Sequence, residues 1–73
     1  MIQTGEAINA AYGALRPGNW LEYHRGMLSI DRETQASPKA VGDAAYLLAV
    51  KGALLVQQRH GYLDYSYLIG KPG

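Results

Sequence analysis

The 73-residue chain contains no cysteine and no phenylalanine, and it lacks a long run of apolar residues. Without cysteine it cannot form a disulfide, a cysteine-based zinc site or a thiol nucleophile. Its longest nearly apolar stretch, Ala44 to Val50, is far shorter than the roughly 20 residues that a membrane span needs. The first residues lack the basic and apolar regions of a signal peptide. We therefore expect a cytoplasmic protein that does not enter a membrane.

Strong charge of either sign is also missing, since seven Lys and Arg stand against six Asp and Glu. A net charge of +1 gives no broad attraction to nucleic acid, to a membrane or to acidic substrates. The length predicts one domain over residues 1–73, with 1–3 and 70–73 as loose termini. A domain of this size buries only about 60–65% of its unfolded surface. Part of the surface of its six tyrosines and Trp20 is therefore available for a partner or a second copy.

Two helices are expected in the first half of the chain. The first runs from Thr4 to Leu15, with Thr4 as its N-cap. Its buried stripe follows helical spacing and consists of Ile8, Ala11, Tyr12 and Leu15. A second helix of about two turns is expected over residues 27–33, anchored by its apolar side chains.

The best-signalled helix follows Ser37, which we expect as its N-cap. Pro38 suits the first helical position, and Gly52 suits the C-terminal stop. The predicted buried stripe comprises Val41, Ala44, Ala45 and Leu48, widened by Leu47. The opposite side carries Lys39, Asp43, Tyr46 and Val50. Gly42 weakens the helix unless a neighbour approaches closely there.

Three strands complete the prediction. The first covers residues 19–26, where aromatic and apolar residues end at a glycine. The other two form a hairpin with His60–Gly61 as its two-residue turn, which places Arg59 opposite Tyr62. This register puts one apolar face on the pairs Val56/Tyr65, Leu54/Tyr67 and Gln58/Leu63, continued by Ile69.

The order of elements is helix, strand, helix, helix, strand, strand. It predicts an α+β, winged-helix-like fold with three helices and a three-stranded antiparallel sheet. In that fold the helix after Ser37 takes the place of the recognition helix, and the hairpin tip forms the wing. Topology alone does not determine what such a domain binds.

Several short segments also carry a resemblance to a known group. They are a Tyr-His-Arg-Gly segment, an Asp-Arg pair, an alanine-rich helix, and a Leu-Val-Gln-x-Arg strand followed by an aromatic strand. In this chain the Tyr-His-Arg-Gly segment lies within Glu22–Leu28, and the Asp-Arg pair is Asp31–Arg32. The Leu-Val-Gln-x-Arg strand is Leu55–Arg59, and the aromatic strand includes Leu63–Tyr65. Together they resemble small, winged-helix-like proteins associated with phages and prophages, over about Gly18 to Ile69. The resemblance implies a phage or mobile-element setting, with binding to DNA or to a host protein.

Signals for catalysis are weak. The two histidines and six acids do not show the spacing of a zinc or EF-hand site. The chain also has neither a nucleophile elbow nor a phosphate-binding loop. We expect no enzyme activity, no metal and no cofactor.

Basic residues give the leading hypothesis, a phage- or prophage-type winged-helix protein that binds duplex DNA modestly as a homodimer. Its expected DNA contacts are Lys39, Arg59, His60, Arg25 and Tyr62. Alternatively, Arg25 and Arg32 are structural and pair with Asp31, Glu22 or Glu33. The predicted recognition helix offers few side chains that read bases. The other hypothesis is therefore a module on the same fold that binds a host or phage protein through Tyr46, Val50 and the aromatic edge of the hairpin.

Overall fold

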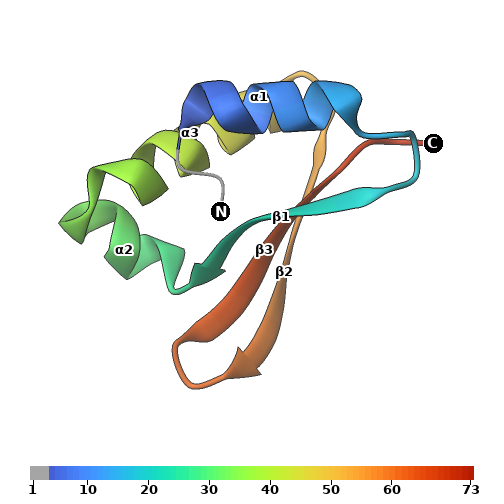
Figure 1. Cartoon of the computed structure of the whole chain (residues 1–73). Coiled ribbons are helices and arrows are strands. Elements are labelled where there is room, and N and C mark those ends of the chain that lie inside the picture. The colour runs from blue at the N-terminus through green and yellow to red at the C-terminus, as the bar shows by residue number, and fades with distance from the viewer. Residues whose placement is uncertain (1–3) are drawn as a thin grey trace.

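A computed structural model describes residues 4–73 and contains three helices and three strands (Figure 1). The helices are α1 (Gly5–Ala14), α2 (Leu28–Thr34) and α3 (Ala36–Val50), and the strands are β1 (Trp20–Gly26), β2 (Leu54–Gly61) and β3 (Asp64–Gly70). This order confirms the predicted α+β, winged-helix-like class. The expected loose terminus at residues 1–3 lies outside the described residues.

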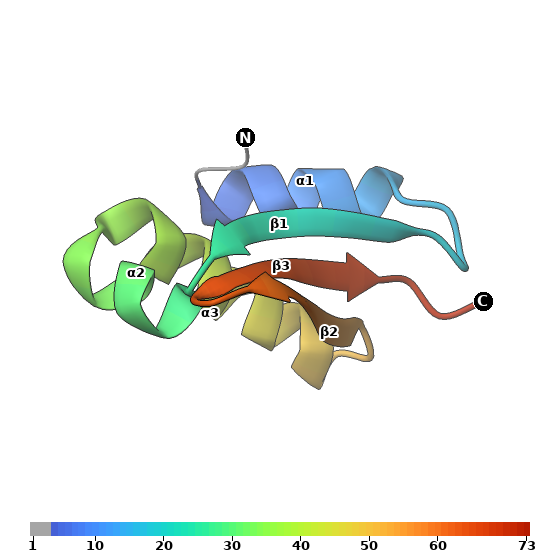
Figure 2. The ribbon, with the colours of Figure 1, turned by 90° about the horizontal axis from the view of Figure 1, so that it is seen from below.

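The three strands form one antiparallel sheet with β3 in the middle, between β1 and β2. Figure 2, seen from below, shows the sheet in front, with α1 and α3 behind it and α2 near one end. The face that points away from the helices is called the outer sheet face here. Alternation along the strands gives this face the side chains of Trp20, Leu54, Val56 and Leu68.

The core lies between the sheet and the helices. Its buried apolar residues are Ile8, Tyr23, Val41, Ala45, Ala53, Tyr67 and Ile69. Ile8, Val41 and Ile69 are the largest side chains that are almost completely enclosed. Burial of each of these contributes about 1.5–3 kcal/mol, so one residue from α1, one from α3 and one from β3 hold the layers together.

The ends of α1 and α3 show which capping predictions are right. Thr4 caps α1, because its hydroxyl accepts a hydrogen bond from the backbone N–H of Ala7 at 3.0 Å. The prediction of Ser37 as the cap of α3 is wrong: the N-cap is Gln35, without a side-chain hydrogen bond. Pro38 is therefore the third helical residue, still within the first turn, where backbone N–H groups lack helical partners.

α3 ends at Val50, with Lys51 as its C-cap, and Gly52 directly after the cap is the predicted stop. The φ of Gly52 is 116°, in the region that favours glycine. The N–H of Gly52 donates to the carbonyl of Ala49, and the N–H of Ala53 donates to that of Leu48, both at 3.0 Å. These two bonds form a Schellman motif, which satisfies two carbonyls of the last turn. The chain then turns directly into β2.

Gly42 has a neighbour across the junction of α2 and α3. A methyl group built on Gly42 would lie 3.5 Å from Leu28 Cδ2, which is ordinary van der Waals contact. Leu28 therefore approaches this side of α3 closely, although not so closely that only glycine fits.

The hairpin turn and register differ from the prediction. The turn is formed by Tyr62 and Leu63, with Gly61 opposite Asp64, and not by His60–Gly61. A bulge between Arg59 and Gly61 accommodates His60 as an extra residue.

Beyond the bulge, Leu54 pairs with Gly70 and Val56 with Leu68. Leu54, Val56 and Gln58 therefore lie on the outer sheet face, opposite to the side that we predicted. The error follows from the period of two along a strand, because a register shift of an odd number of residues exchanges the faces of β2.

The C-terminal segment was expected to be loose from residue 70, but hydrogen bonds hold it to the rest of the fold as far as Lys71. Gly70 belongs to β3, and the backbone of Lys71 forms hydrogen bonds with Gly18 and Asn19. The Lys71 ammonium donates to the carbonyl of Gly13 at 3.3 Å and lies 4.9 Å from the ring centre of Tyr12. A cation at the C-terminal end of α1 is favourable for the helix dipole.

Candidate protein-interaction surface

The outward side of α3 forms one continuous stripe. It is called the α3 outer stripe here and consists of Lys39, Asp43, Tyr46, Leu47 and Val50. At 100° per residue these positions share one side of the helix. The opposite side is buried through Pro38, Val41 and Ala45. The stripe therefore faces solvent along nearly the whole helix.

The second half of the α3 outer stripe is strongly apolar and strongly exposed. Tyr46, Leu47 and Val50 expose 65%, 60% and 69% of their surface, respectively. The prediction that Leu47 widens the buried stripe is wrong, because the neighbouring Leu48 and Ala44 already fill the space against the core. Three such side chains together expose roughly 350 Å², which is comparable with the largest apolar patch of a typical monomer.

The charged residues of α3 are arranged around this apolar part. Asp43 is neutralised by an ion pair with Arg32 of α2. Lys39 and Lys51 are both exposed, and they lie at the two ends of the helix. Twelve residues of helix separate them by about 18 Å. The apolar second half of the α3 outer stripe thus lies between Lys39, which begins the stripe, and Lys51, which follows its last residue. The one carboxylate of the stripe is already paired.

The hairpin tip carries three of the residues predicted to bind DNA. Arg59 Nε donates a long hydrogen bond of 3.4 Å to the carbonyl of Gly61. His60 Nε2 lies 2.6 Å from the Ser66 hydroxyl on the outer sheet face, so this nitrogen has a partner within the hairpin. Tyr62 is 85% exposed at the turn. The tip therefore presents one aromatic ring and one cation to solvent.

Arg25 has a structural partner that the sequence did not indicate. Its guanidinium binds Asp64 with two hydrogen bonds, from Nε at 2.8 Å and from a terminal nitrogen at 3.1 Å. The hydrogen bond from Arg25 lowers the pKa of Asp64, and the same bond raises the pKa of Arg25. The pair joins the end of β1 to the start of β3 beside the hairpin tip. The expected partners of Arg25 and Arg32 were wrong, but their interpretation as paired residues was right.

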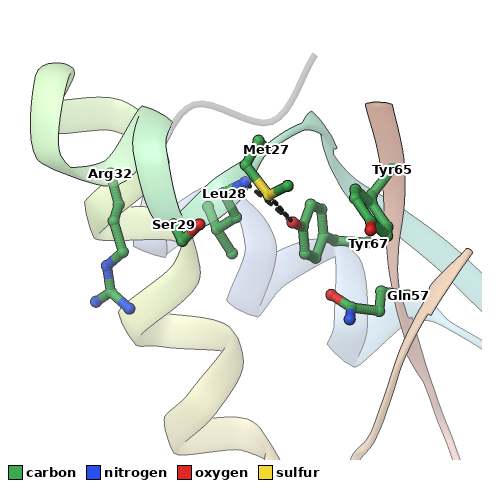
Figure 3. Close-up of a pocket in the computed structure, with 7 residues that line it drawn as sticks. All are labelled: Met27, Leu28, Ser29, Arg32, Gln57, Tyr65 and Tyr67. Atoms are coloured by element: carbon green, nitrogen blue, oxygen red, sulfur yellow. Dashed lines mark hydrogen bonds between the residues drawn. The ribbon is translucent and has the colours of Figure 1, made fainter. Parts of the chain in front are cut away.

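The start of α2 is fastened to the sheet by two polar contacts. The Tyr67 hydroxyl accepts a hydrogen bond from the N–H of Leu28 at 3.0 Å and lies 3.8 Å from the Met27 sulfur (Figure 3). His24 Nε2 lies 2.8 Å from Asp31 Oδ2, and the His24 side chain is nearly buried. Burial raises the pKa of Tyr23, whose ring packs beside that of Tyr67.

An open pocket of about 440 Å³ lies between α2 and the hairpin (Figure 3). It is lined by Met27, Leu28, Ser29, Arg32, Gln57, Tyr65 and Tyr67. Arg32 is the one charged residue of this lining and already pairs with Asp43. The pocket is therefore an open hollow with a mixed polar and apolar lining, and its one charged side chain is already paired.

The predicted site residues fall into separate places. Lys39 begins the α3 outer stripe, whereas Arg59, His60 and Tyr62 lie at the hairpin tip, which projects away from the helices (Figure 1). Tyr46 and Val50, predicted to bind protein, do lie together, and Leu47 joins them. The sequence signal for Leu47 was its position three residues before Val50, on the edge of the same side of the helix.

Comparisons with protein-family models, with curated proteins and with solved structures found no match for this chain. Between residues 4 and 73, no helix is long and apolar enough to cross a membrane. Within the same range, no three His, Asp or Glu side chains are grouped closely enough to hold a metal ion. The class defined by fold and surface is a winged-helix-like α+β domain with an apolar outward face on α3.

Proposed function

We propose that this domain binds another protein, of host or phage origin, through the α3 outer stripe. The partner presents an apolar surface flanked by carboxylates, because the apolar part of the stripe lies between the ammonium groups of Lys39 and Lys51. The observation that carries the proposal is the high exposure of Tyr46, Leu47 and Val50 on adjacent turns of one helix. A helix that reads DNA needs polar or basic side chains at these positions instead.

The size of this surface sets the expected affinity. Burying roughly 350 Å² of apolar area on this side contributes up to about 9 kcal/mol before losses. Association costs on the order of 4–15 kcal/mol in lost motional freedom. Burial of matching apolar surface on the partner offsets the rest of this association cost. We therefore expect a dissociation constant on the order of 10 μM.

Crosslinking identifies candidates for the partner. A photoreactive phenylalanine analogue replaces Tyr46 in one version of the protein and Tyr62 in a control version, and both are irradiated in a bacterial lysate. A protein captured from position 46 and not from position 62 is then purified. Capture selects the candidate, and the titration below tests it.

The captured protein is titrated against the wild-type domain, Tyr46→Ala, Val50→Ala and the control Tyr62→Ala. We expect the two α3 variants to bind about 10-fold more weakly or worse, because central apolar contacts dominate such interfaces. Tyr62→Ala should bind like the wild type. Equal affinities for the wild type and both α3 variants would refute the proposal. Charge reversal at Lys39 and Lys51 should weaken binding most at low salt, which tests the flanking carboxylates.

Duplex DNA is the second candidate, favoured by the winged-helix order and by the exposed cations at Lys39 and Arg59. Two or three phosphate contacts by these residues and His60 give affinities that fall about 10- to 40-fold between 50 and 200 mM salt. A titration with random-sequence duplex tests this. A wild-type affinity that depends steeply on salt, and that is lost in Lys39→Glu/Arg59→Glu, would place DNA first. Absence of binding at the lower salt would remove it.

A further inference from the structure

β2 is an edge strand with one unused side. It pairs with β3, and no other strand of residues 4–73 pairs with its opposite side. Every residue of β2 except Gly61 is exposed. An exposed edge leaves backbone N–H and C=O groups free to pair with another chain, and natural edges are protected by charge, proline or a covering element.

The first five residues of this edge, Leu54–Gln58, have none of the usual sequence protection. They include neither a charged residue nor a proline, and the bulge falls beyond them, between Arg59 and Gly61. Their apolar side chains are exposed on both faces of the strand: Leu54 and Val56 at 47% on the outer sheet face, and Leu55 at 40% on the helix-facing side. An incoming strand would therefore find free hydrogen-bonding groups with apolar contacts on both sides.

We propose that β2 pairs with β2 of a second copy, antiparallel and about a two-fold axis, so that two sheets join into one of six strands. The inference goes beyond the proposed function, because β2 is not part of the α3 outer stripe. A pair of identical strands related by such an axis is antiparallel, so the same five residues of each copy form the contact.

The charges around the edge fit a second copy. With the two-fold axis at Val56, Leu54 lies opposite Gln58, and Leu55 lies opposite Gln57. Arg59, the first charged residue after Leu54–Gln58, then faces Ala53 of the other copy and not another arginine. Like charges directly opposite each other would destabilise the pair. The net charge of +1 also gives two copies little mutual repulsion.

The area of the edge predicts a reversible dimer. The exposed parts of Leu54, Leu55 and Val56 amount to roughly 230 Å² per copy. The total of roughly 500 Å² is well below the roughly 1,000 Å² that a stable interface buries, and is in the range of weak, reversible contacts. We therefore expect dissociation in the range of about 10–100 μM, so that mass depends on concentration.

Sedimentation equilibrium from about 5 to 500 μM measures this directly. The wild type should pass from monomer to twice the monomer mass. Val56→Lys places two ammonium groups at the axis and should raise the dissociation constant about 30-fold or more. Tyr62→Lys carries the same charge at the hairpin tip and should dimerise like the wild type. A wild type that stays monomeric at the highest concentration, or a Val56→Lys variant that dimerises normally, would overturn the proposal.

A cysteine variant keeps the test valid if Val56→Lys fails to fold. Because the chain has no cysteine, Val56→Cys introduces a single thiol, and strands paired at the axis bring the two copies within disulfide distance. Mild oxidation should link Val56→Cys into a covalent dimer about 10-fold faster than Tyr62→Cys. Equal rates for the two variants would contradict a β2–β2 interface.

Discussion

Tyr67→Phe tests how α2 is attached to the sheet. Leu28 is the first residue of α2, the N-cap Met27 provides no side-chain hydrogen bond, and the N–H of Leu28 donates to the Tyr67 hydroxyl at 3.0 Å. A strand residue 39 positions away thus performs the capping role that a local serine or aspartate usually has. Removal of one oxygen leaves a partly buried backbone donor without its partner.

The expected loss of stability combines two effects. A typical net hydrogen bond contributes about 1 kcal/mol, and an unsatisfied buried donor costs about 1–3 kcal/mol. Because this site is only partly buried, we expect Tyr67→Phe to lower the free energy of unfolding by about 1–2 kcal/mol. For a domain of this size, each kcal/mol shifts the melting temperature by about 4–8 °C.

Thermal and urea unfolding followed by circular dichroism measure the effect, with Tyr65→Phe as the matched control. Tyr65 lies on the same face of β3 with its ring 6.2 Å from that of Tyr67, and no hydrogen bond of its hydroxyl is found in the described chain. The control should change stability by less than about 0.5 kcal/mol. If both variants lose the same stability, the Tyr67 hydroxyl does not cap α2 and the reasoning fails.

Four smaller changes test other parts of the fold, and urea unfolding measures the stability of the first three variants. Gly42→Ala should stabilise α3 by about 0.5–1 kcal/mol, because the added methyl fits and alanine favours the helix. Leu63→Asn should stabilise by about 0.5–1 kcal/mol, because Leu63 has a φ of 55° and asparagine tolerates that region better. Thr4→Ala should cost about 1 kcal/mol through loss of the α1 cap. Arg25→Gln should raise the pKa of Asp64, followed by NMR titration, toward its ordinary value.

The sign of the last effect also gives a pH dependence. The pKa of Asp64 is lowered in the folded state, so the pair adds stability above the ordinary pKa of an aspartate and loses it as the pH falls through the lowered value. Arg25→Gln should therefore reduce the acid sensitivity of unfolding. An unchanged titration of Asp64 in the Arg25→Gln variant would contradict the assignment of this pair, and a destabilising Gly42→Ala would contradict the packing described for α3.

Hydrophobic spacing was sufficient to predict the order of elements and much of the core. The stripe of α1 around Ile8, the stripe of α3 around Val41 and Ala45, and the inward side of β3 at Tyr67 and Ile69 are all confirmed. These positions are fixed by local periodicity combined with burial. The Thr4 cap and the Gly52 stop also depend only on residues nearby, which is why the sequence reveals them.

Features that depend on contacts between distant residues could not be predicted in this way. The His60–Gly61 pair is a stronger local turn signal than Tyr62–Leu63, yet the pairing of β3 with both neighbours and the bulge at His60 place the turn two residues later. Ser37 does not cap α3, because Gln35 is both the C-cap of α2 and the N-cap of α3. The same limit applies to the Arg25–Asp64 pair at the hairpin tip.

The central position of β3 has a consequence for how the protein folds. β1 and β2 do not pair with each other, so neither can join a sheet until β3 has formed its own contacts. The β1–β3 ladder, with Trp20 opposite Gly70, closes a loop that contains both α2 and α3. Contacts that distant raise the relative contact order and slow folding. We therefore expect the β2–β3 hairpin to form early and the docking of β1 to limit the folding rate.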